Sequence, residues 1–430
     1  MKIINTTDSN FEKEFENILA RAKTDIKGVS AIVSNIIEEI VDNGNLAIKG
    51  HISKFDKWEV KQDSDLEISL DEMKKAYENI DDELRKSLHT AYDRIKSYHE
   101  KQLPKSWIDF EKNGSILGQK VTAVDRAGLY IPGGKAAYPS SLLMNAIPAI
   151  VAGVEEIVVC TPTPNNEINE LLLAACHICG IKKAFKVGGA SAIAAMAYGT
   201  ETIPKVDVIT GPGNIFVATA KKLVFGEVNI DMIAGPSEIG ILSDASANPR
   251  FLAIDLLSQA EHDEMASSIM ITTCDKVAEL TSIEVDRFLQ ELSRREIAKK
   301  SIDERGVIII AKDMNEAIKY MNEIAPEHLE IMTNNAFELL PKIKHAGAIF
   351  LGKNTPEPIG DYIAGPNHTL PTGSTAKFYS PLNVENFLKK SSIISFSQEA
   401  IDELGEACAL LADTEGLTAH AKSVRVRLEK

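Results

Sequence analysis

A glutamate and a histidine, Glu327 and His328, stand side by side directly after Pro326. An imidazole with an ordinary pKa of about 6.5 can accept a proton at neutral pH, and a neighbouring carboxylate can activate water. Apolar spacing predicts a helix over residues 314–324, and the proline should push Ala325 toward an extended conformation that ends this helix. The pair is therefore expected on a helix-to-strand turn, where an irregular backbone lets adjacent side chains share a pocket. The alternative is a solvated loop that carries two polar residues.

Gln259 and His262 are three residues apart at the end of a helix predicted over residues 249–262, so they share one face. They could hold a common ion, because zinc binds imidazole nitrogen and carboxylate or amide oxygen. Two residues do not complete a tetrahedral site. Completing it requires residues such as Asp361 and His420, which sequence spacing alone cannot place nearby. The alternative is an ordinary helix end at the surface.

Glycine and proline form three turns in the middle of the chain: Pro132-Gly133-Gly134, Gly211-Pro212-Gly213-Asn214 and Gly235-Pro236-Ser237. The second turn opens a predicted helix, where free backbone N–H groups favour an anion such as a dinucleotide pyrophosphate. A complete Gly-x-Gly-x-x-Gly pattern is missing, since no third glycine follows Gly213. Tight turns chosen for their geometry alone are the alternative.

The composition of the 430 residues is that of an ordinary globular enzyme. The chain has 47 Lys and Arg against 62 Asp and Glu, a net charge of −15, so nucleic acid is not expected as a partner. No apolar run reaches the length of a membrane span and no signal peptide is evident, so we expect a cytoplasmic protein without a membrane partner. Five scattered cysteines fit a reducing compartment.

Short apolar strands alternate with helices from residue 127 onward, a pattern typical of parallel sheets covered by helices on both faces. The first series has predicted strands at 127–131, 156–160, 183–187 and 206–209, and helices at 140–152, 167–179, 190–198 and 214–225. The second series has predicted strands at 239–242, 268–273, 306–310, 328–332 and 348–351. The predicted class is α/β, with two tandem doubly wound, Rossmann-like domains, an N-terminal helical segment and a C-terminal helical tail.

These patterns divide the chain into four predicted parts. Residues 1–115 form the N-terminal segment, with helices over 9–50 and 70–102, partly packed on the α/β domains. Residues 116–238 form the first α/β domain, beginning with a strand at 116–123, and residues 239–381 form the second. The second ends in a proline-rich loop over 352–381, and loops of this length are usually functional. Residues 382–430 form the tail, with a helix over 397–411.

Six segments together resemble the histidinol dehydrogenase family over nearly the whole chain, from about residue 20 to the tail. They are Gly128-Leu129-Tyr130-Ile131-Pro132-Gly133-Gly134, Gly211-Pro212-Gly213-Asn214, Ala234-Gly235-Pro236-Ser237-Glu238, Ser258-Gln259-Ala260-Glu261-His262-Asp263, Ala325-Pro326-Glu327-His328-Leu329, and a segment from Gly360-Asp361-Tyr362 through Gly365-Pro366-Asn367-His368 to Leu370-Pro371-Thr372.

The resemblance implies an enzyme that uses zinc and NAD to oxidise L-histidinol to L-histidine in four electrons. It implies one zinc ion per subunit, held by Gln259, His262, Asp361 and His420. The last ligand would come from the other subunit of a homodimer whose C-terminal tails are exchanged. The first α/β domain would then bind the cofactor, and the second would carry the zinc and catalytic residues.

The resemblance also implies roles for single residues. Glu327 and His328 would be catalytic, with His328 as the base and Glu327 activating water for the aldehyde. NAD would contact Tyr130, Ser191 and Asn214. Substrate contacts would be Ser237, Gln259, His262, His328, Asp361, His368, Glu415 and His420.

One position departs from the family pattern. Gly188-Gly189-Ala190-Ser191-Ala192 stands where the family has Gly-Gly-Ala-Gln-Ala, so the shorter Ser191 replaces a glutamine that contacts the cofactor. A glutamine at this position should tighten NAD unless neighbouring residues compensate.

Two other functions are alternatives to this one. A related zinc dehydrogenase could act on another small alcohol, since similar folds serve different substrates. A catalytically inert nucleotide-binding or assembly protein would have no reason to keep four dispersed zinc ligands, and a metal assay separates the two.

Overall fold

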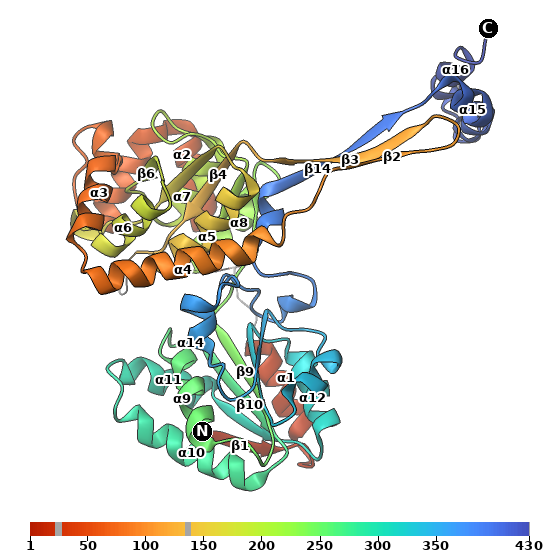
Figure 1. Ribbon diagram of the computed structural model, residues 1–430. Helices are drawn as coiled ribbons and strands as arrows, with labels where there is room; N and C mark the ends of the chain where they lie inside the picture. Colours follow the sequence, from red (N-terminus) through yellow and green to blue (C-terminus); the bar gives the residue numbers. More distant parts are fainter. Residues whose placement is uncertain (22–27, 134–138, 430) are drawn as a thin grey trace. The chain divides into compact units, whose positions relative to one another are not determined.

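The computed structural model describes residues 1–21, 28–133 and 139–429 (Figure 1). They form two compact units: unit one holds Met1–Gln102 and Asp125–Phe387, and unit two holds Leu103–Val124 and Leu388–Lys430. Parallel sheets with helices make up unit one, which confirms the predicted α/β class. Gly134 of the first glycine turn lies outside the described residues.

The first sheet of unit one is parallel, with strand order β6-β5-β4-β7-β8. The chain runs outward from β4 to β6 and then adds β7 on the other side of β4. The boundary between β4 and β7 is thus a topological switch point, where open α/β sheets bind ligands beyond their carboxyl ends. Its strands are β4 (Arg126–Tyr130), β5 (Glu156–Cys160), β6 (Lys183–Phe185), β7 (Val208–Thr210) and β8 (Asn229–Ile230).

Two groups of helices pack with this sheet. One group shares a buried apolar cluster with it and comprises α2 (Ser30–His51), α7 (Gly189–Tyr198) and α8 (Ile215–Val224). The other group packs in pairs and comprises α3 (Leu70–Asn79), α4 (Asp82–Glu100), α5 (Pro139–Ala152) and α6 (Glu170–Ile178).

The second sheet is also parallel, with strand order β1-β11-β10-β9-β12-β13. Its strands are β1 (Lys2–Asn5), β9 (Glu238–Ser243), β10 (Ser267–Thr272), β11 (Val307–Ile310), β12 (His328–Met332) and β13 (Ala348–Leu351). One apolar cluster joins it to α1 (Phe11–Arg21) and α12 (Met314–Ile324), and another joins it to α9 (Pro249–Ala260), α10 (Asp275–Leu289) and α11 (Arg295–Arg305). Its switch point lies between β9 and β12.

Apart from β12 and β13, the segment between α12 and unit two has little regular structure. It contains α13 (Ala336–Leu339) and, after β13, the single turn α14 (Glu357–Ile359), which continues into a π-helical turn, Gly360–Ala364. The predicted proline-rich loop thus holds only short helical turns.

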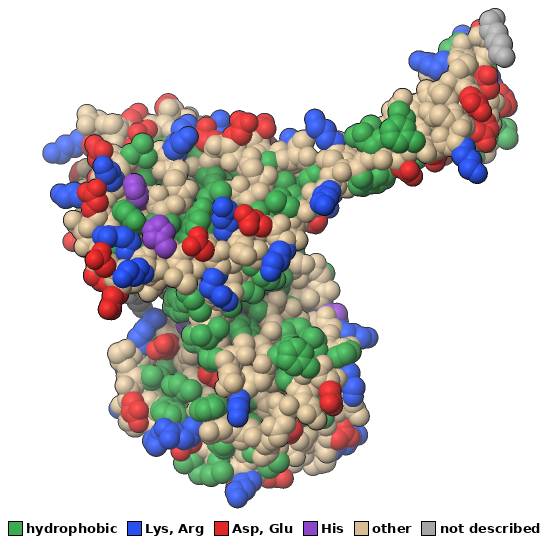
Figure 2. Space-filling model, viewed as in Figure 1, with side chains coloured by type: hydrophobic (Ala, Val, Ile, Leu, Met, Phe, Trp, Pro, Cys, Tyr) green, Lys and Arg blue, Asp and Glu red, His purple; other side chains and the backbone are tan. Residues whose placement is uncertain are grey.

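Unit two is an antiparallel sheet of order β14-β3-β2, followed by two helices. Its strands are β2 (Trp107–Phe110), β3 (Ile116–Ala123) and β14 (Leu388–Ser395), and its helices are α15 (Gln398–Thr414) and α16 (Thr418–Arg425). Several large apolar side chains of the sheet are exposed, and Figure 2 shows hydrophobic side chains along these strands.

Three expectations about the first 125 residues are wrong. The predicted strand at 116–123 does form, but it pairs with β14 of the tail rather than with the first α/β sheet. Residues 2–5, expected in a helical segment, form an edge strand beside β11. The helix predicted over 70–102 is two helices, because Ile80 is extended and the carboxylate of Asp81 caps a new helix by accepting from the N–H of Leu84.

Within residues 1–21, 28–133 and 139–429, no helix combines the length and the apolar composition that a bilayer span requires.

Candidate active site

The turn that carries Glu327 and His328 begins with an unusual residue. Helix α12 ends at Ile324 as predicted, but Ala325 is left-handed (φ 50°, ψ 61°) rather than extended. Its N–H donates to the carbonyl of Met321, and this C-cap bond, with full burial of Ala325, outweighs the preference of a residue that precedes proline. Glu327 then lies just before β12, and His328 is the first residue of that strand.

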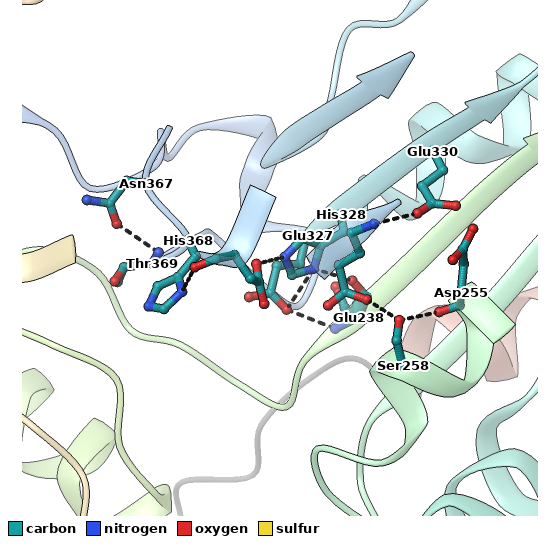
Figure 3. Close-up of polar contacts among 11 residues, drawn as sticks. Glu238, Asp255, Ser258, Glu327, His328, Glu330, Asn367, His368 and Thr369 are labelled. Atoms are coloured by element: carbon teal, nitrogen blue, oxygen red, sulfur yellow. Dashed lines mark hydrogen bonds and ion pairs between the residues drawn. The ribbon is translucent and has the colours of Figure 1, made fainter. Parts of the chain in front are cut away.

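One residue of β9 holds both members of the pair. The backbone N–H of Glu238 donates to Glu327 Oε2 at 2.9 Å, and the carbonyl of Glu238 accepts from His328 Nδ1 at 3.2 Å (Figure 3). Glu327 is 7% exposed and His328 is 3% exposed, and Glu327 Oε2 lies 3.8 Å from His328 Nδ1. The backbone of Glu238 therefore holds the Glu327 carboxylate and the His328 imidazole next to each other.

The bond to Glu238 fixes which nitrogen of His328 is basic. A carbonyl can only accept, so Nδ1 carries the proton and Nε2 carries the lone pair. Nε2 lies 3.4 Å from Asp361 Oδ1 and, among the described residues, makes no hydrogen bond. The basic nitrogen of His328 is thus directed toward the residues of the predicted metal site.

Burial disfavours charge on the acids around this pair. It raises the pKa of Glu327 to about 7, an effect that His328 partly offsets, and burial together with the charge of Glu327 raises the pKa of Glu238 to about 8. Burial alone would lower the pKa of His328, but the surrounding carboxylates, Glu327 first, hold it well above its ordinary value. A divalent cation beside Asp361 would oppose that effect, because it repels an imidazolium.

Three side chains gather next to His328 with the donor atoms of a metal site. One ligand atom each from His262, Glu357 and Asp361 lies within 4.8 Å of the others. An imidazole nitrogen and two carboxylate oxygens suit zinc. The predicted ligands His262 and Asp361 are therefore brought together.

The side chain of Gln259 indicates whether a metal ion fits this group of residues. Its side chain is completely buried, yet among the described residues neither its Oε1 nor its Nε2 has a hydrogen-bond partner. A buried amide without partners costs free energy, so such a group is normally engaged by something else. A cation bound through Oε1 would supply that partner, and the residues present fit the predicted ion.

Glu357 was not among the predicted site residues. This buried glutamate accepts at Oε2 from the hydroxyl of Ser258 at 2.8 Å, its N–H donates to Glu330 Oε1 at 2.9 Å, and its Oε1 has no partner among the described residues. Burial raises its pKa to about 7. The available signal was a carboxylate between two prolines, four residues before Asp361, where a helical turn brings both acids to one face.

A cavity of about 670 Å³ adjoins these residues, lined by His328, Asp361 and His368 among others. His368 Nδ1 donates to the carbonyl of Asp361 at 3.1 Å, which orients the imidazole (Figure 3). Ser237 directly precedes Glu238, the residue that holds the Glu327–His328 pair, at the start of β9. The cavity is ample for a small amino alcohol.

The three predicted cofactor residues belong to the other sheet. Tyr130 ends β4, and its hydroxyl accepts from the N–H of Gly189 at 3.2 Å, at the start of the helix that carries Ser191. Asn214 caps α8: its Oδ1 accepts from the N–H groups of Phe216 and Val217 at 3.0 and 3.2 Å. Tyr130 and Asn214 thus lie at or beyond the carboxyl ends of β4 and β7, the strands on either side of the switch point, and Ser191 lies on the helix that follows β6.

A buried ion pair fixes the glycine turn in front of Asn214. Asp231 Oδ2 accepts from the N–H of Gly211 at 2.9 Å, Lys221 Nζ donates to the Gly211 carbonyl at 3.0 Å, and the two side chains pair with each other. Gly211 has φ 120°, and a Cβ there would lie 2.0 Å from the Tyr130 carbonyl oxygen. Only glycine fits this position.

The remaining two predicted residues lie in unit two. Glu415 follows the last residue of α15 and His420 lies on α16, and both are exposed. Their place in a site stays a prediction.

Comparison with known proteins bears on the whole chain. The histidinol dehydrogenase family model matches residues 19–428. Histidinol dehydrogenase of Sulfurimonas denitrificans is 69% identical over 423 residues, 98% of each chain, and that of Wolinella succinogenes is 66% identical over 100% of this chain and 99% of its own. The crystal structure of histidinol dehydrogenase from Elizabethkingia anophelis superposes with a TM-score of 0.94 at 35% identity, covering 100% of this chain and 98% of the other. The chain therefore belongs to the histidinol dehydrogenase family.

Proposed function

We propose that the protein oxidises L-histidinol to L-histidine through L-histidinal, reducing two molecules of NAD. The observation that carries the proposal is the position of the His328 imidazole: Nδ1 lies 3.8 Å from the water-activating candidate Glu327, and Nε2 faces Asp361, which gathers with His262 and Glu357. A base with a second carboxylate on one side and a cation site on the other is what the two oxidations require.

The proposed zinc ligands are Gln259, His262 and Asp361 of one subunit and His420 of the other. When bound, zinc would act as a Lewis acid that grips the imidazole and amine of the substrate and so fixes the reacting carbon. The unpartnered amide of Gln259 and the close approach of His262 to Asp361 support this assignment.

His328 is the proposed base in both oxidations. In the first, Nε2 takes the hydroxyl proton of histidinol while a hydride leaves the same carbon for the nicotinamide, which yields the aldehyde and NADH. In the second, Nε2 takes a hydroxyl proton from the hydrated aldehyde while another hydride leaves, which yields the carboxylic acid. The bond from Nδ1 to Glu238 keeps the same nitrogen available in both steps.

Glu327 is the proposed base for the hydration of the aldehyde between the two oxidations. Its carboxylate accepts a proton from a water molecule as the oxygen adds to the aldehyde carbon, and the proton returns to the former carbonyl oxygen. Glu327 Oε2 is held by the N–H of Glu238, so the carboxylate has a fixed position beside His328.

We further propose a homodimer in which the C-terminal tails are exchanged. Unit two exposes Trp107, Ile108, Phe110 and Ile394, each more than half accessible, on a sheet of only three strands. Such a sheet needs a cover for its apolar side chains, and a second copy would supply one. All five cysteines are free thiols, which is consistent with the cytoplasm.

The test is incubation of purified protein with L-histidinol, NAD and zinc while NADH absorbance and product are followed. Two NADH and one histidine should form for each histidinol consumed. One NADH with accumulating aldehyde, or no NADH at all in a zinc-loaded protein, contradicts the proposal. Replacing His328 by Asn provides the inactive control.

A further inference from the structure

A chain of three hydrogen-bonded side chains leads from the protein surface to Ser191. His51 Nδ1 lies 2.8 Å from Ser191 Oγ, and His51 Nε2 lies 2.7 Å from Glu39 Oε2. Ser191 and His51 are 5% and 9% exposed, whereas the side chain of Glu39 is 59% exposed. Glu39 and His51 lie on α2, which packs against α7, the helix of Ser191.

The exposed end of this chain sets the proton positions at its buried end. An ionised carboxylate only accepts, so the bond at Nε2 requires a proton on Nε2. The neutral ring then has its lone pair on Nδ1, and the Ser191 hydroxyl must donate to it. Ser191 Oγ is left with lone pairs alone, so toward any further partner it can act only as an acceptor.

Ser191 lies at the edge of the sheet that suits a dinucleotide. It is in the first turn of α7, two residues after Gly189, whose N–H donates to the hydroxyl of Tyr130. Tyr130 ends β4, and across the switch point the Gly211 turn follows β7. Parallel α/β sheets bind nucleotides at this place.

We infer that His51, oriented by Glu39, is a positioning residue for the cofactor: it makes Ser191 Oγ an acceptor for a hydroxyl or amino group of NAD. This inference rests on the proposed function. A phosphate at Ser191 is excluded, because two acceptors repel. The imidazole also compensates for the short side chain of serine. A glutamine at position 191 would clash with His51, which now forms a hydrogen bond with Ser191.

The first experiment measures the NAD dissociation constant calorimetrically in the zinc-loaded full-length protein. Ser191→Ala and His51→Phe should each weaken NAD about three- to tenfold, the effect of one neutral hydrogen bond. The double variant should be no weaker than either single one, because both remove the same contact. Ser191→Gln should weaken NAD as well. His89→Phe on α4, which removes an imidazole hydrogen-bonded to Tyr77 of α3, is the matched control and should leave NAD binding unchanged.

A second variant reverses the proton positions without touching the buried residues. The ammonium of Glu39→Lys only donates, so Nε2 must accept, the ring proton moves to Nδ1, and Ser191 Oγ becomes the acceptor of His51. This variant should lose NAD affinity, though by no more than Ser191→Ala, because accepting from His51 occupies one of the two lone pairs of Ser191 Oγ. Glu39→Gln, whose carbonyl can still accept, should stay within about twofold of the wild type.

NAD analogues identify the donor. Nicotinic acid adenine dinucleotide lacks the carboxamide N–H, and nicotinamide hypoxanthine dinucleotide lacks the adenine amino group. The analogue without the true donor should bind equally to wild type and Ser191→Ala, and if both analogues still discriminate, the donor is a ribose hydroxyl.

Three results of the NAD measurements overturn the inference. They are unchanged NAD affinity in Glu39→Lys and His51→Phe, additive losses in the double variant, and tighter NAD in Ser191→Gln. An equal loss of L-histidinol affinity in these variants would show a general structural defect and also overturn it. A protein that binds NAD but fails to oxidise histidinol would instead contradict the proposed function and leave these binding comparisons intact.

Discussion

His328 directs Nε2 to within 3.4 Å of Asp361 Oδ1, because its other ring nitrogen is held by a backbone carbonyl of β9. The two residues come from different elements, the start of β12 and the π-helical turn after α14. The base and the proposed metal ligand thus meet through tertiary structure, and any account of the reaction depends on this contact.

Replacing Gln259 by Leu should have opposite effects with and without zinc. In metal-free protein the change removes a buried amide without partners and should raise the free energy of unfolding by about 1–3 kcal/mol. Zinc affinity should fall, so added zinc should stabilise the variant less than the wild type. Urea unfolding with EDTA or with zinc measures both, and Gln290→Leu at the exposed end of α10 is the control. A variant stabilised by zinc as much as the wild type would remove Gln259 from the metal site.

Glu238→Gln should flatten the pH dependence of stability. The folded pKa of about 8 lies above the ordinary 4.5, so the folded state keeps a proton that the unfolded state releases. The free energy of unfolding should therefore fall as pH rises from about 4.5 to 8, by up to about 1 kcal/mol per pH unit from this group. Urea unfolding of metal-free protein at several pH values measures the slope, with Glu296→Gln on the surface of α11 as control. Parallel curves for Glu238→Gln and wild type would contradict the assignment.

The Lys221–Asp231 pair should matter for stability and for NAD. Removing one partner of a buried pair leaves the other charge unpaired, so Lys221→Met should lower the free energy of unfolding by about 3–5 kcal/mol. It also frees the Gly211 turn that precedes Asn214, so the NAD dissociation constant should rise while that of histidinol stays unchanged. Pairing Lys221→Met with Asp231→Leu should recover much of the stability but not the NAD affinity. Normal NAD binding in the double variant would show that the pair acts on folding alone.

Local patterns in the sequence predicted most elements of the α/β part but not their partners. Periodicity placed the helix over 314–324 and the strands 156–160 and 328–332 at their observed bounds. It could not show that β3 pairs with β14, or β1 with β11, because those contacts join distant segments. The extended conformation predicted for Ala325 is wrong for a related reason, because burial and a C-cap bond outweigh the local preference of a residue that precedes proline.

The candidate site was predictable where a motif carried the chemistry. Glu327, His328, His262 and Asp361 do lie together, although only the fold brings β12, α9 and the turn after α14 to one place. Glu357 had only its spacing of four residues from Asp361 as a signal, and the backbone of Glu238 had none. Their contribution depends on burial and on backbone direction, which spacing along the chain does not record.

Exchange of the tails predicts complementation between two inactive variants. His420→Ala and His262→Ala homodimers should each be inactive, because every site lacks one ligand. In the mixed dimer one site combines an intact core with an intact tail and the other is doubly broken, so random association should restore roughly a quarter of wild-type sites and the purified mixed dimer about half. NAD reduction by the mixture and by the purified mixed dimer checks this. A verified heterodimer without activity would place His420 in its own subunit's site or outside the site.

His328 and Glu327 are proposed to act in different steps, His328 in the two oxidations and Glu327 in the hydration between them. His328→Asn should lower both oxidations by about 10²–10⁴-fold with zinc retained, because each needs the base. Glu327→Gln should affect only the step that needs water.

The most direct measurement compares two reactions of histidinal in a zinc-loaded Glu327→Gln protein. Reduction of histidinal by NADH requires no water and should proceed within about tenfold of the wild-type rate, whereas oxidation of histidinal by NAD requires hydration and should fall by about 10²–10⁴-fold. Equal loss of both reactions, with zinc content and fold intact, would contradict a water-activating role for Glu327 distinct from the base His328.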